Sequence, residues 1–316
     1  MLYFFINKHN KYLNPTLNNT KPYILNINYL NIHTLKFFVL TLVLGLALFL
    51  FNSCKKYSPA TPAFFIKATS INVVTTASLQ GSTSNKITEL WLYLNGKYQG
   101  AYPMGSLMPI PNNGQNTTVD VFAGIQNNGI KSTRITWLFY DKIEFDTLVE
   151  NGKIAERAFT FKYNPGVKFE WIEDFDSNSG FSIINSSVSS TTFTTVSAPE
   201  SFEGKSIKLQ LTTTKTIAQI ESALSYSLPL GSSNVYLEVD YKCFQPFEIG
   251  LIAGSTPKPV FNLNASPNWN KIYINLADIV NSAPISNTHK IYFKMVKAND
   301  SDDSRLYLDN IKVIHF

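Results

Sequence analysis

Three carboxylates with even spacing are the side chains of this sequence whose pattern is closest to a catalytic set. Glu144, Asp146 and Glu150 lie in the segment IEFDTLVE, and alternate residues of a β-strand point to the same face. Two carboxylates about 5–5.5 Å apart on one face would serve as nucleophile and acid in a retaining glycosidase. Leu148 stands between Asp146 and Glu150 on that face, so the acidic row is interrupted.

The segment resembles the Glu-x-Asp-x-x-Glu strand of laminarinase-type β-sandwich glycosidases, with one departure. The last glutamate, Glu150, is one residue too far along the chain. The preceding Tyr140-Asp141-Lys142 favours a turn, and hence a short hairpin strand, over a long catalytic strand. Glycoside hydrolase is therefore the remote alternative, and we expect the protein not to be an enzyme.

Other catalytic and nucleic-acid-binding patterns lack the residues that they need. Beyond residue 54 the sequence has two histidines, His289 and His315, too few for a zinc site built on histidines. A glycine-rich phosphate loop does not occur. Nucleic-acid binding needs clustered basic residues, and the same part of the sequence has only three arginines, well separated, with scattered lysines.

One cysteine has a position typical of covalent modification. Residues 33–56 read HTLKFFVLTLVLGLALFLFNSCKK, in which Lys36 precedes fifteen apolar or small residues and Ser53 leads into Cys54. A cation, a short apolar core and small residues before a cleavage point are typical of a secretory leader. Spanning a bilayer takes about 20 apolar residues, which argues against the alternative of an uncleaved anchor; a plain secreted protein is the other alternative.

This segment resembles a bacterial lipoprotein signal peptide, residues 33–53, whose lipobox ends in a cysteine that becomes the acylated N-terminus. Phe51 and Asn52 depart from the commonest lipobox residues. The resemblance implies lipidation of Cys54 and a place in the cell envelope, with the outer membrane favoured. Lys55 and Lys56 replace the acidic residues that accompany surface export in some Gram-negative bacteria, so the membrane face stays open.

Residues 1–32 precede the leader and are rich in Asn, Tyr and Lys without a sustained period. We expect that translation begins further on, near Leu30 to Leu35, and peptides from residues 1–30 in a cellular mass spectrum would contradict this. Without the leader, the formal net charge falls from +5 to about +1 because four lysines are removed. No basic surface is then predicted.

After a Ser/Pro-rich linker at residues 54–62, the sequence predicts an all-β protein of two β-sandwich domains, immunoglobulin-like and then jelly roll. The first, residues 63–165, contains Asn95-Gly96 between alternating strands, a strong hairpin signal. Trp91 and Tyr93 should therefore lie opposite Tyr98 or its neighbours. The stretch ELWLYLNGKYQGAYPM resembles the start of PEGA-type and related immunoglobulin-like modules, which implies a spacer or docking unit.

The second domain, residues 166–316, opens with KFEWIEDFDSNSGFSI, contains NWNKIYINLADIV and ends in RLYLDNIKVIHF. This pattern resembles the galactose-binding-like jelly roll of carbohydrate-binding modules. The alternation in VYLEVDYKCF predicts that Cys243 is a buried thiol on the apolar face of a strand. Aromatic residues that bind a sugar cannot be named from this sequence.

The resemblance also implies a structural calcium ion, with Asp174 and Asp309 at matching positions and no other cofactor. Asp309 shares strand parity with Ile311 and Val313, so it can point inward, where a carboxylate needs partners. The alternative is that Asp309 caps a turn or accepts backbone N–H bonds. The acidic residues Asp300, Asp302 and Asp303 read as a solvated loop.

The predicted function is binding without catalysis by a lipid-anchored protein of the cell envelope. A glycan is the expected partner of the jelly roll, alongside the membrane that holds the lipid. The alternative is a scaffolding lipoprotein that binds another envelope protein. A groove with two or more solvent-facing aromatic rings would favour the glycan, and a flat apolar patch would favour the protein.

Overall fold

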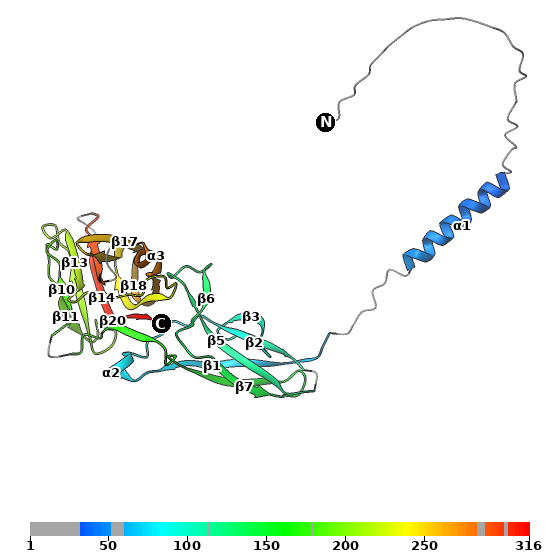
Figure 1. Cartoon of the computed structure of the whole chain (residues 1–316), viewed down its shortest axis with the longest axis horizontal. Helices are drawn as coiled ribbons and strands as arrows, with labels where there is room; N and C mark the ends of the chain where they lie inside the picture. Colours follow the sequence, from blue (N-terminus) through cyan, green and yellow to red (C-terminus); the bar gives the residue numbers. More distant parts are fainter. Residues whose placement is uncertain (1–31, 52–59, 113, 178–179, 283–287, 300–302) are drawn as a thin grey trace, which may run out of the picture. The chain divides into compact units, whose positions relative to one another are not determined.

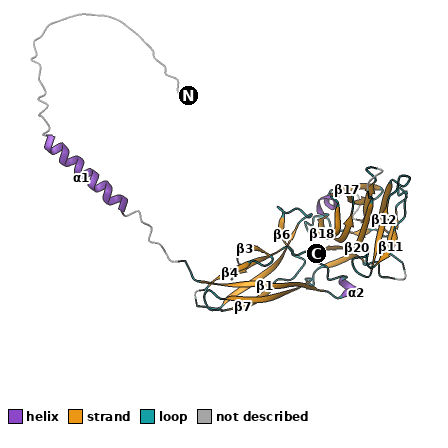
Figure 2. Cartoon of the chain, turned by 180° about the vertical axis from the view of Figure 1, so that it is seen from behind, coloured by secondary structure: helices purple, strands orange, loops and turns teal. Residues whose placement is uncertain are grey.

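The structure is a computed structural model, and it divides the chain into two compact units, Met1–Ala60 and Thr61–Phe316. It describes most of the chain, namely residues 32–51, 60–112, 114–177, 180–282, 288–299 and 303–316. We call residues 61–165 the first half and residues 166–316 the second half of the larger unit. Figure 1 shows the strands of both halves, and Figure 2 shows them from behind.

Helix α1, Ile32–Phe51, covers almost all of the predicted leader. Its run of apolar residues has no polar or charged break after Lys36 apart from Thr41, whose hydroxyl donates to the carbonyl oxygens of Phe37 and Phe38. Within the described part of the chain, no helix is long and apolar enough to cross a membrane. Cys54 lies outside the described residues, so its acylation stays a prediction.

The first half consists of two sheets, which share one hydrophobic core. One sheet has the order β4-β1-β8, and the other has the order β3-β2-β5-β6 with β7 paired to β5. The elements are β1 (Ala63–Val74), α2 (Ala77–Gln80), β2 (Glu89–Leu94), β3 (Lys97–Pro103), β4 (Leu107–Pro111), β5 (Thr117–Gln126), β6 (Arg134–Thr136), β7 (Ile143–Thr147) and β8 (Ile154–Lys162). Strand β1 pairs in parallel with β8, and its other ladder is antiparallel.

The predicted hairpin at Asn95-Gly96 is present between β2 and β3. Both residues have positive φ, 48° and 74°, which a two-residue hairpin loop of this twist requires. Tyr93 pairs directly with Tyr98, as the alternation predicted. Leu90, Leu92 and Leu94 of β2 are buried, so Trp91 and Tyr93 lie on the opposite face of the sheet.

The second half is a sandwich of two six-stranded sheets. The orders are β10-β13-β19-β16-β17 with β14 on β19, and β11-β12-β20-β15-β18 with β9 on β20. The elements are β9 (Lys168–Glu173), β10 (Ile183–Asn185), β11 (Thr194–Ser197), β12 (Lys205–Gln210), β13 (Ile217–Ser222), β14 (Tyr226–Ser227), β15 (Val235–Cys243), β16 (Phe247–Ala253), β17 (Thr256–Leu263), β18 (Ser266–Asn275), α3 (Ala277–Asn281), β19 (Thr288–Val296) and β20 (Arg305–His315).

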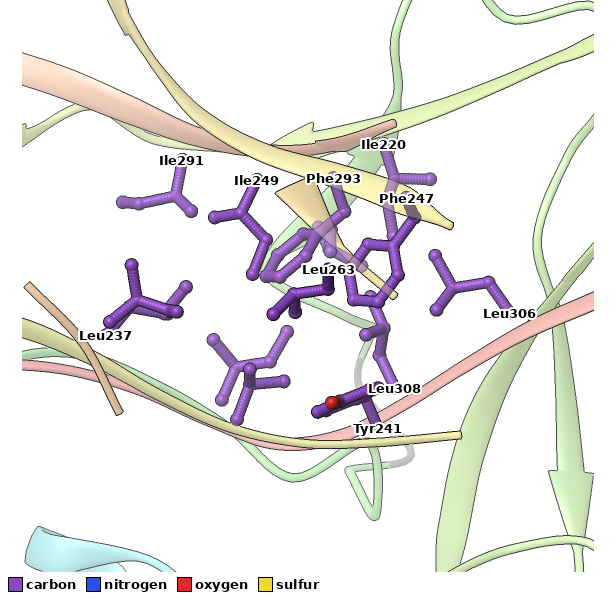
Figure 3. Packing of buried hydrophobic residues seen from close by; sticks show 14 of the residues in the cluster. Ile220, Leu237, Tyr241, Phe247, Ile249, Leu263, Ile291, Phe293, Leu306 and Leu308 are labelled. Atoms are coloured by element: carbon purple, nitrogen blue, oxygen red, sulfur yellow. The ribbon is translucent and has the colours of Figure 1, made fainter. Parts of the chain in front are cut away.

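Apolar side chains from both sheets fill the space between them. Figure 3 shows Ile249, Phe293 and Ile291 from one sheet above Leu237, Leu308 and Tyr241 from the other. Cys243 is fully buried in this cluster, as predicted, and burial raises the pKa of its thiol to about 11. At that pKa almost no thiolate exists at neutral pH, so Cys243 is an unreactive packing residue.

The predicted all-β class is confirmed, with several corrections in detail. Strand β1 is continuous from Ala63 to Val74, with an irregular register between Ala68 and Ser70. The short helices α2 and α3 were not predicted. The immunoglobulin-like assignment and the boundary at residues 165–166 stay predictions, because both halves belong to one compact unit.

Candidate functional site

A cleft lies where the two halves meet, against the outer face of the sheet that contains β15, β18 and β20. We call it the junction cleft; its cavity is about 290 Å³ and is lined by Ser84, Asn85, Lys86, Phe202, Asp240, Trp269, Asn270 and Lys271. A second cavity of about 400 Å³ shares Lys86, Asn270 and Lys271 with it. The two cavities therefore adjoin one another along three polar side chains.

Strand β18 brings the aromatic and polar parts of the cleft together. Its Ile272 and Ile274 are buried in the sandwich core, so Lys271 and Tyr273 lie on the other face. Trp269 and Asn270 precede them in the same strand. Phe202 comes from the connection between β11 and β12, and Ser84 to Lys86 come from the first half, between α2 and β2.

One wall of the junction cleft is aromatic, and a lysine ammonium lies against its rings. The Trp269 ring centre lies 5.4 Å from that of Phe202 and 6.2 Å from that of Tyr307. The Lys242 ammonium lies 5.1 Å from the centre of the Trp269 ring and 4.2 Å from that of Tyr307, a distance at which cations attract aromatic faces. Phe202 is 38% exposed and Trp269 is partly exposed, so both present ring surface to solvent.

The opposite wall is polar, and its groups have fixed orientations. Lys86 Nζ donates to Asn270 Oδ1 at 2.6 Å, and Asn270 Nδ2 donates to the Tyr241 hydroxyl at 2.9 Å. Ser84 Oγ donates to Asp240 Oδ1 at 2.9 Å. The Lys86 and Ser84 bonds tie side chains of the first half to strands of the second, so a ligand in the cleft would meet pre-positioned donors and acceptors.

Buried charges form the floor of the cleft. Lys271 Nζ lies 3.5 Å from Glu238 Oε2 and 3.6 Å from Asp240 Oδ2, and all three residues are almost fully buried. Burial raises the pKa of Asp240, and the Lys271 ammonium counteracts part of that rise. Burial also lowers the pKa of Lys271, but the carboxylates of Asp240 and Glu238 more than offset this, and the net shift is upward. The attraction between the Lys271 ammonium and the two carboxylates therefore offsets the cost of burying these three charges.

The same charged layer joins the two halves. The Tyr163 hydroxyl of the first half donates to Glu238 Oε1 at 2.9 Å. Lys312 Nζ of the second half donates to the Ser82 carbonyl oxygen at 2.6 Å and to the Tyr163 hydroxyl at 3.3 Å. Because each group would be costly to bury without its partner, these bonds fix one position of the halves.

An aromatic contact completes the junction beside the charged layer. The Trp137 ring of the first half lies 4.9 Å from that of Tyr236 and 4.7 Å from that of Tyr273, centre to centre. Tyr236, Tyr273 and Ile314 belong to the hydrophobic core of the first half, although they are residues of the second. These ring contacts and the charged layer together hold the two halves against one another beside the cleft.

Asp309 and the apolar residues Ile311 and Val313 lie on opposite faces of strand β20, although their sequence spacing is even. Strand β20 contains an extra residue at Asp309–Asn310, where the register with β15 shifts and Asn310 has φ 46°. Because such a bulge reverses the alternation, Ile311 joins the core while Asp309 lies among polar groups of the other face. The expectation that Asp309 points inward with Ile311 is wrong for this reason.

The alternative role considered for Asp309 matches its contacts. Asp309 Oδ2 accepts from Ser206 Oγ at 2.7 Å and from the Glu203 N–H at 3.1 Å, and Oδ1 accepts from the Asn310 N–H at 2.8 Å. Calcium requires oxygen ligands, whereas the groups that surround the Asp309 carboxylate are N–H and O–H donors. Asp174 Oδ1 accepts the Asp176 N–H.

These contacts do not fit a calcium ion shared by Asp174 and Asp309. Among the described residues, no three His, Cys, Asp or Glu side chains are arranged to hold a metal ion. The calcium ion at Asp174 and Asp309 stays a prediction, which a calcium titration of the folded protein tests.

Two of the three carboxylates of the glycosidase alternative have partners in the first half. Strand β7 ends at Thr147, so Glu150 lies beyond the strand and outside its alternation. Glu144 is paired with Lys142 at 2.6 Å, and Asp146 accepts from the Thr118 hydroxyl at 2.7 Å. The two groups are therefore occupied by local interactions.

Sequence reasoning missed the junction cleft almost entirely. Trp269 stood in the quoted segment NWNKIYINLADIV, but its exposure could not be read from the sequence. Phe202 and Ser84 lie in connections without a period, so no pattern marks them. Trp171, by contrast, is a core residue of the second half.

Comparison with known proteins gives no family for this chain. No protein-family model matches the sequence, and no curated protein matches it. Among solved structures, a family 11 carbohydrate-binding module of Clostridium thermocellum, in complex with a β-1,3-1,4-mixed-linked tetrasaccharide, is 15% identical. It covers 46% of this chain and 94% of its own, with a TM-score of 0.30.

Two further solved structures are similar at the same level. The K3 adhesin domain of Lys-gingipain from Porphyromonas gingivalis is 13% identical, covers 47% of this chain and 99% of its own, and has a TM-score of 0.30. A family 22 xylan-binding domain from Paenibacillus barcinonensis is 9% identical, covers 46% and 93%, and has a TM-score of 0.31. Similarity this low does not bear on what this chain binds.

Proposed function

We propose that this chain is a non-enzymatic protein of the cell envelope, anchored by a lipid on Cys54, that binds a glycan in the junction cleft. The observation that carries the binding proposal is the pair Phe202 and Trp269. Two rings, 5.4 Å apart and open to solvent, stand over a cavity whose other lining side chains are polar. A sugar presents apolar ring faces and hydroxyl groups, and this wall offers a partner to each.

The charge of the cleft supports an uncharged or weakly charged glycan. Asp240 and Lys271 largely neutralise one another. Two further cations are already engaged, since Lys86 is bonded to Asn270 and Lys242 lies against the Trp269 and Tyr307 rings. Asp240 would repel a strongly anionic ligand, and Lys86 and Lys271 would repel a cationic one. Hydroxyl groups can bond to any of these side chains without an unpaired charge.

The test is a glycan-array experiment on the full chain and on Trp269→Ala and Phe202→Ala. Leu224→Ala, which removes a side chain that is 65% exposed, is the control. We expect saturable binding to one glycan class, at least about tenfold weaker in both cleft variants and unchanged in the control. Chelator should leave binding unchanged, because the donors around Asp309 do not fit calcium.

Absence of glycan binding by folded protein would contradict the proposal and favour the scaffolding lipoprotein. Anchoring is tested separately, by incorporation of a radiolabelled fatty acid into the wild-type chain. Substitution Cys54→Ser should abolish the label if Cys54 carries the lipid. Label retained in that variant would refute lipidation at this residue.

A further inference from the structure

A row of four aromatic rings lies on the outer face of a first-half sheet, away from the core of that half. Trp91 and Tyr93 come from β2, Tyr98 from β3 and Phe122 from β5. Trp91 and Tyr98 have ring centres 5.4 Å apart, Tyr93 and Tyr98 also 5.4 Å, and Tyr93 and Phe122 5.2 Å. We call these residues the aromatic row; Tyr98 is 52% exposed and the others are partly exposed.

The fold holds Trp91 in place at one end of the row. A Cβ atom on Gly124 of β5 would lie 2.6 Å from Trp91 Nε1, so the indole rests against backbone that only glycine leaves free. Trp91 Nε1 donates to Glu89 Oε1 at 3.2 Å. Glu89 is 2% exposed, and its other oxygen is paired with Arg134 at 3.3 Å. A buried carboxylate thus fixes the indole before any ligand arrives.

The charged residues beside the aromatic row already have partners of opposite charge. Lys142 lies 2.8 Å from Asp120 and 2.6 Å from Glu144, and Arg134 is paired with Glu89. The hydroxyls of Tyr93 and Tyr98 make no hydrogen bond with other groups in the part of the chain that the structure describes. The face therefore offers ring surface and free phenolic hydroxyls, and the charges of Lys142 and Arg134 beside the row are compensated by carboxylates.

We propose that the aromatic row is a second glycan-binding surface, which takes an uncharged polysaccharide chain. The apolar faces of successive sugars match the rings, and their hydroxyls match the phenolic groups. A charged polymer would have to separate Lys142 and Arg134 from the carboxylates with which they are paired. This surface is built only from the first half, so its occupation does not depend on the junction cleft.

The test is native gel electrophoresis of the full chain in gels that contain a soluble polysaccharide. The uncharged probes are mixed-linkage β-glucan, xylan and mannan, and polygalacturonate is the anionic probe. The variants are Trp91→Ala and Tyr98→Ala in the row and Trp269→Ala in the cleft, with Leu148→Ala as an exposed control of the first half. Circular dichroism melting establishes that each variant is folded.

We expect one uncharged polysaccharide to retard the protein, with an apparent affinity at least about tenfold lower in both row variants. Trp269→Ala should retain this row-dependent part of the binding, and Leu148→Ala should match the wild type. Tyr98 is exposed on an edge strand, so Tyr98→Ala remains informative if Trp91→Ala does not fold.

Three outcomes would overturn this proposal. The first is equal retardation of wild type and both row variants, and the second is no retardation by any uncharged probe. The third is self-association of the wild type that Tyr98→Ala abolishes, measured by light scattering, because the occupant would then be a second copy of the chain. If the first outcome is accompanied by loss of binding in Trp269→Ala, the junction cleft is supported in place of the aromatic row.

Discussion

Lys312 in the last strand donates a hydrogen bond of 2.6 Å to the carbonyl oxygen of Ser82, which precedes it by 230 residues in the sequence. The same ammonium also reaches the Tyr163 hydroxyl of the first half. Burial lowers the pKa of Lys312 to about 8, from 10.5. The junction between the halves is therefore held by a lysine that is costly to keep charged.

Lys312 should give the stability of the protein a distinct dependence on alkaline pH. Because its pKa is lower in the folded state, the unfolded state binds more protons between pH 8 and 10.5. This group then makes stability rise with pH over that window. Tyrosine ionisation enters above about pH 10, so urea unfolding at pH 7.5 and 9.5 isolates the effect.

Lys312→Met serves as the reference for that measurement. The free energy of unfolding of the wild type, relative to this variant, should increase by roughly 1–2 kcal/mol from pH 7.5 to 9.5. An unchanged or decreasing difference would show that Lys312 has an ordinary pKa.

Asp309 should make the stability of the protein fall as pH rises, in a lower pH range than that of Lys312. Burial raises the pKa of this carboxyl from 3.8 to about 7. The folded state then binds more protons than the unfolded state between those values, so its contribution lowers stability as pH rises from about 4 to 7. Relative to Asp309→Asn, the wild type should lose roughly 1–3 kcal/mol of unfolding free energy from pH 4.5 to 7.5. Parallel pH profiles of the two proteins would refute the raised pKa.

Tyr163→Phe should destabilise the protein by about 1–3 kcal/mol, because it leaves buried Glu238 without one donor and Lys312 without one acceptor. Urea unfolding gives this value. Tyr102→Phe is the matched control, since that hydroxyl makes no hydrogen bond within the described residues. Equal effects of the two substitutions would mean that the Tyr163 bonds contribute nothing specific.

The second half expressed alone, as Val167–Phe316, should be poorly soluble or unfolded. Its Tyr236, Tyr273 and Ile314 would lose the apolar cover of the first half, and Lys312 would lose both acceptors. Solubility and a thermal melt of this fragment, beside residues 61–316, provide the measurement. A cooperative melt at a similar temperature would establish instead that the halves are independent domains.

Gly124→Ala should weaken polysaccharide binding by the aromatic row and should also lower the stability of the protein. The new methyl group would displace the Trp91 indole and the Glu89 side chain, which lie 2.6 Å and 2.5 Å from its position. Affinity should fall as in Trp91→Ala, with a loss of about 1–3 kcal/mol in unfolding free energy. Unaltered retardation in the polysaccharide gel would show that the orientation of Trp91 is irrelevant.

Local patterns predicted the parts of this fold whose geometry is set by neighbouring residues. The hairpin at Asn95-Gly96 followed from the need for positive φ, and the apolar face of β15 followed from its alternation. Asp309 was misplaced because one extra residue in β20 reverses the alternation, and no sequence signal marks that bulge.

The junction cleft could not be predicted, since its residues come from elements far apart in the sequence. Ser84, Phe202 and Trp269 meet only when the two halves are joined. Lys271, Glu238 and Lys312 look like solvent-facing positions of amphipathic strands, yet they are buried because the first half covers that face. Their burial depends on long-range packing, which periodicity does not contain.

Strand β20 lies between β12 and β15 and is the partner of β9, although all three of these strands precede it in the sequence. Until residues 305–315 have emerged, β9, β12 and β15 each present an unpaired edge, which is a template for association with other chains. A nascent or prematurely terminated chain therefore cannot close its second sheet. Only a chain that includes β20 hides these edges, so a chain that stops before residue 305 leaves them open to association and proteolysis.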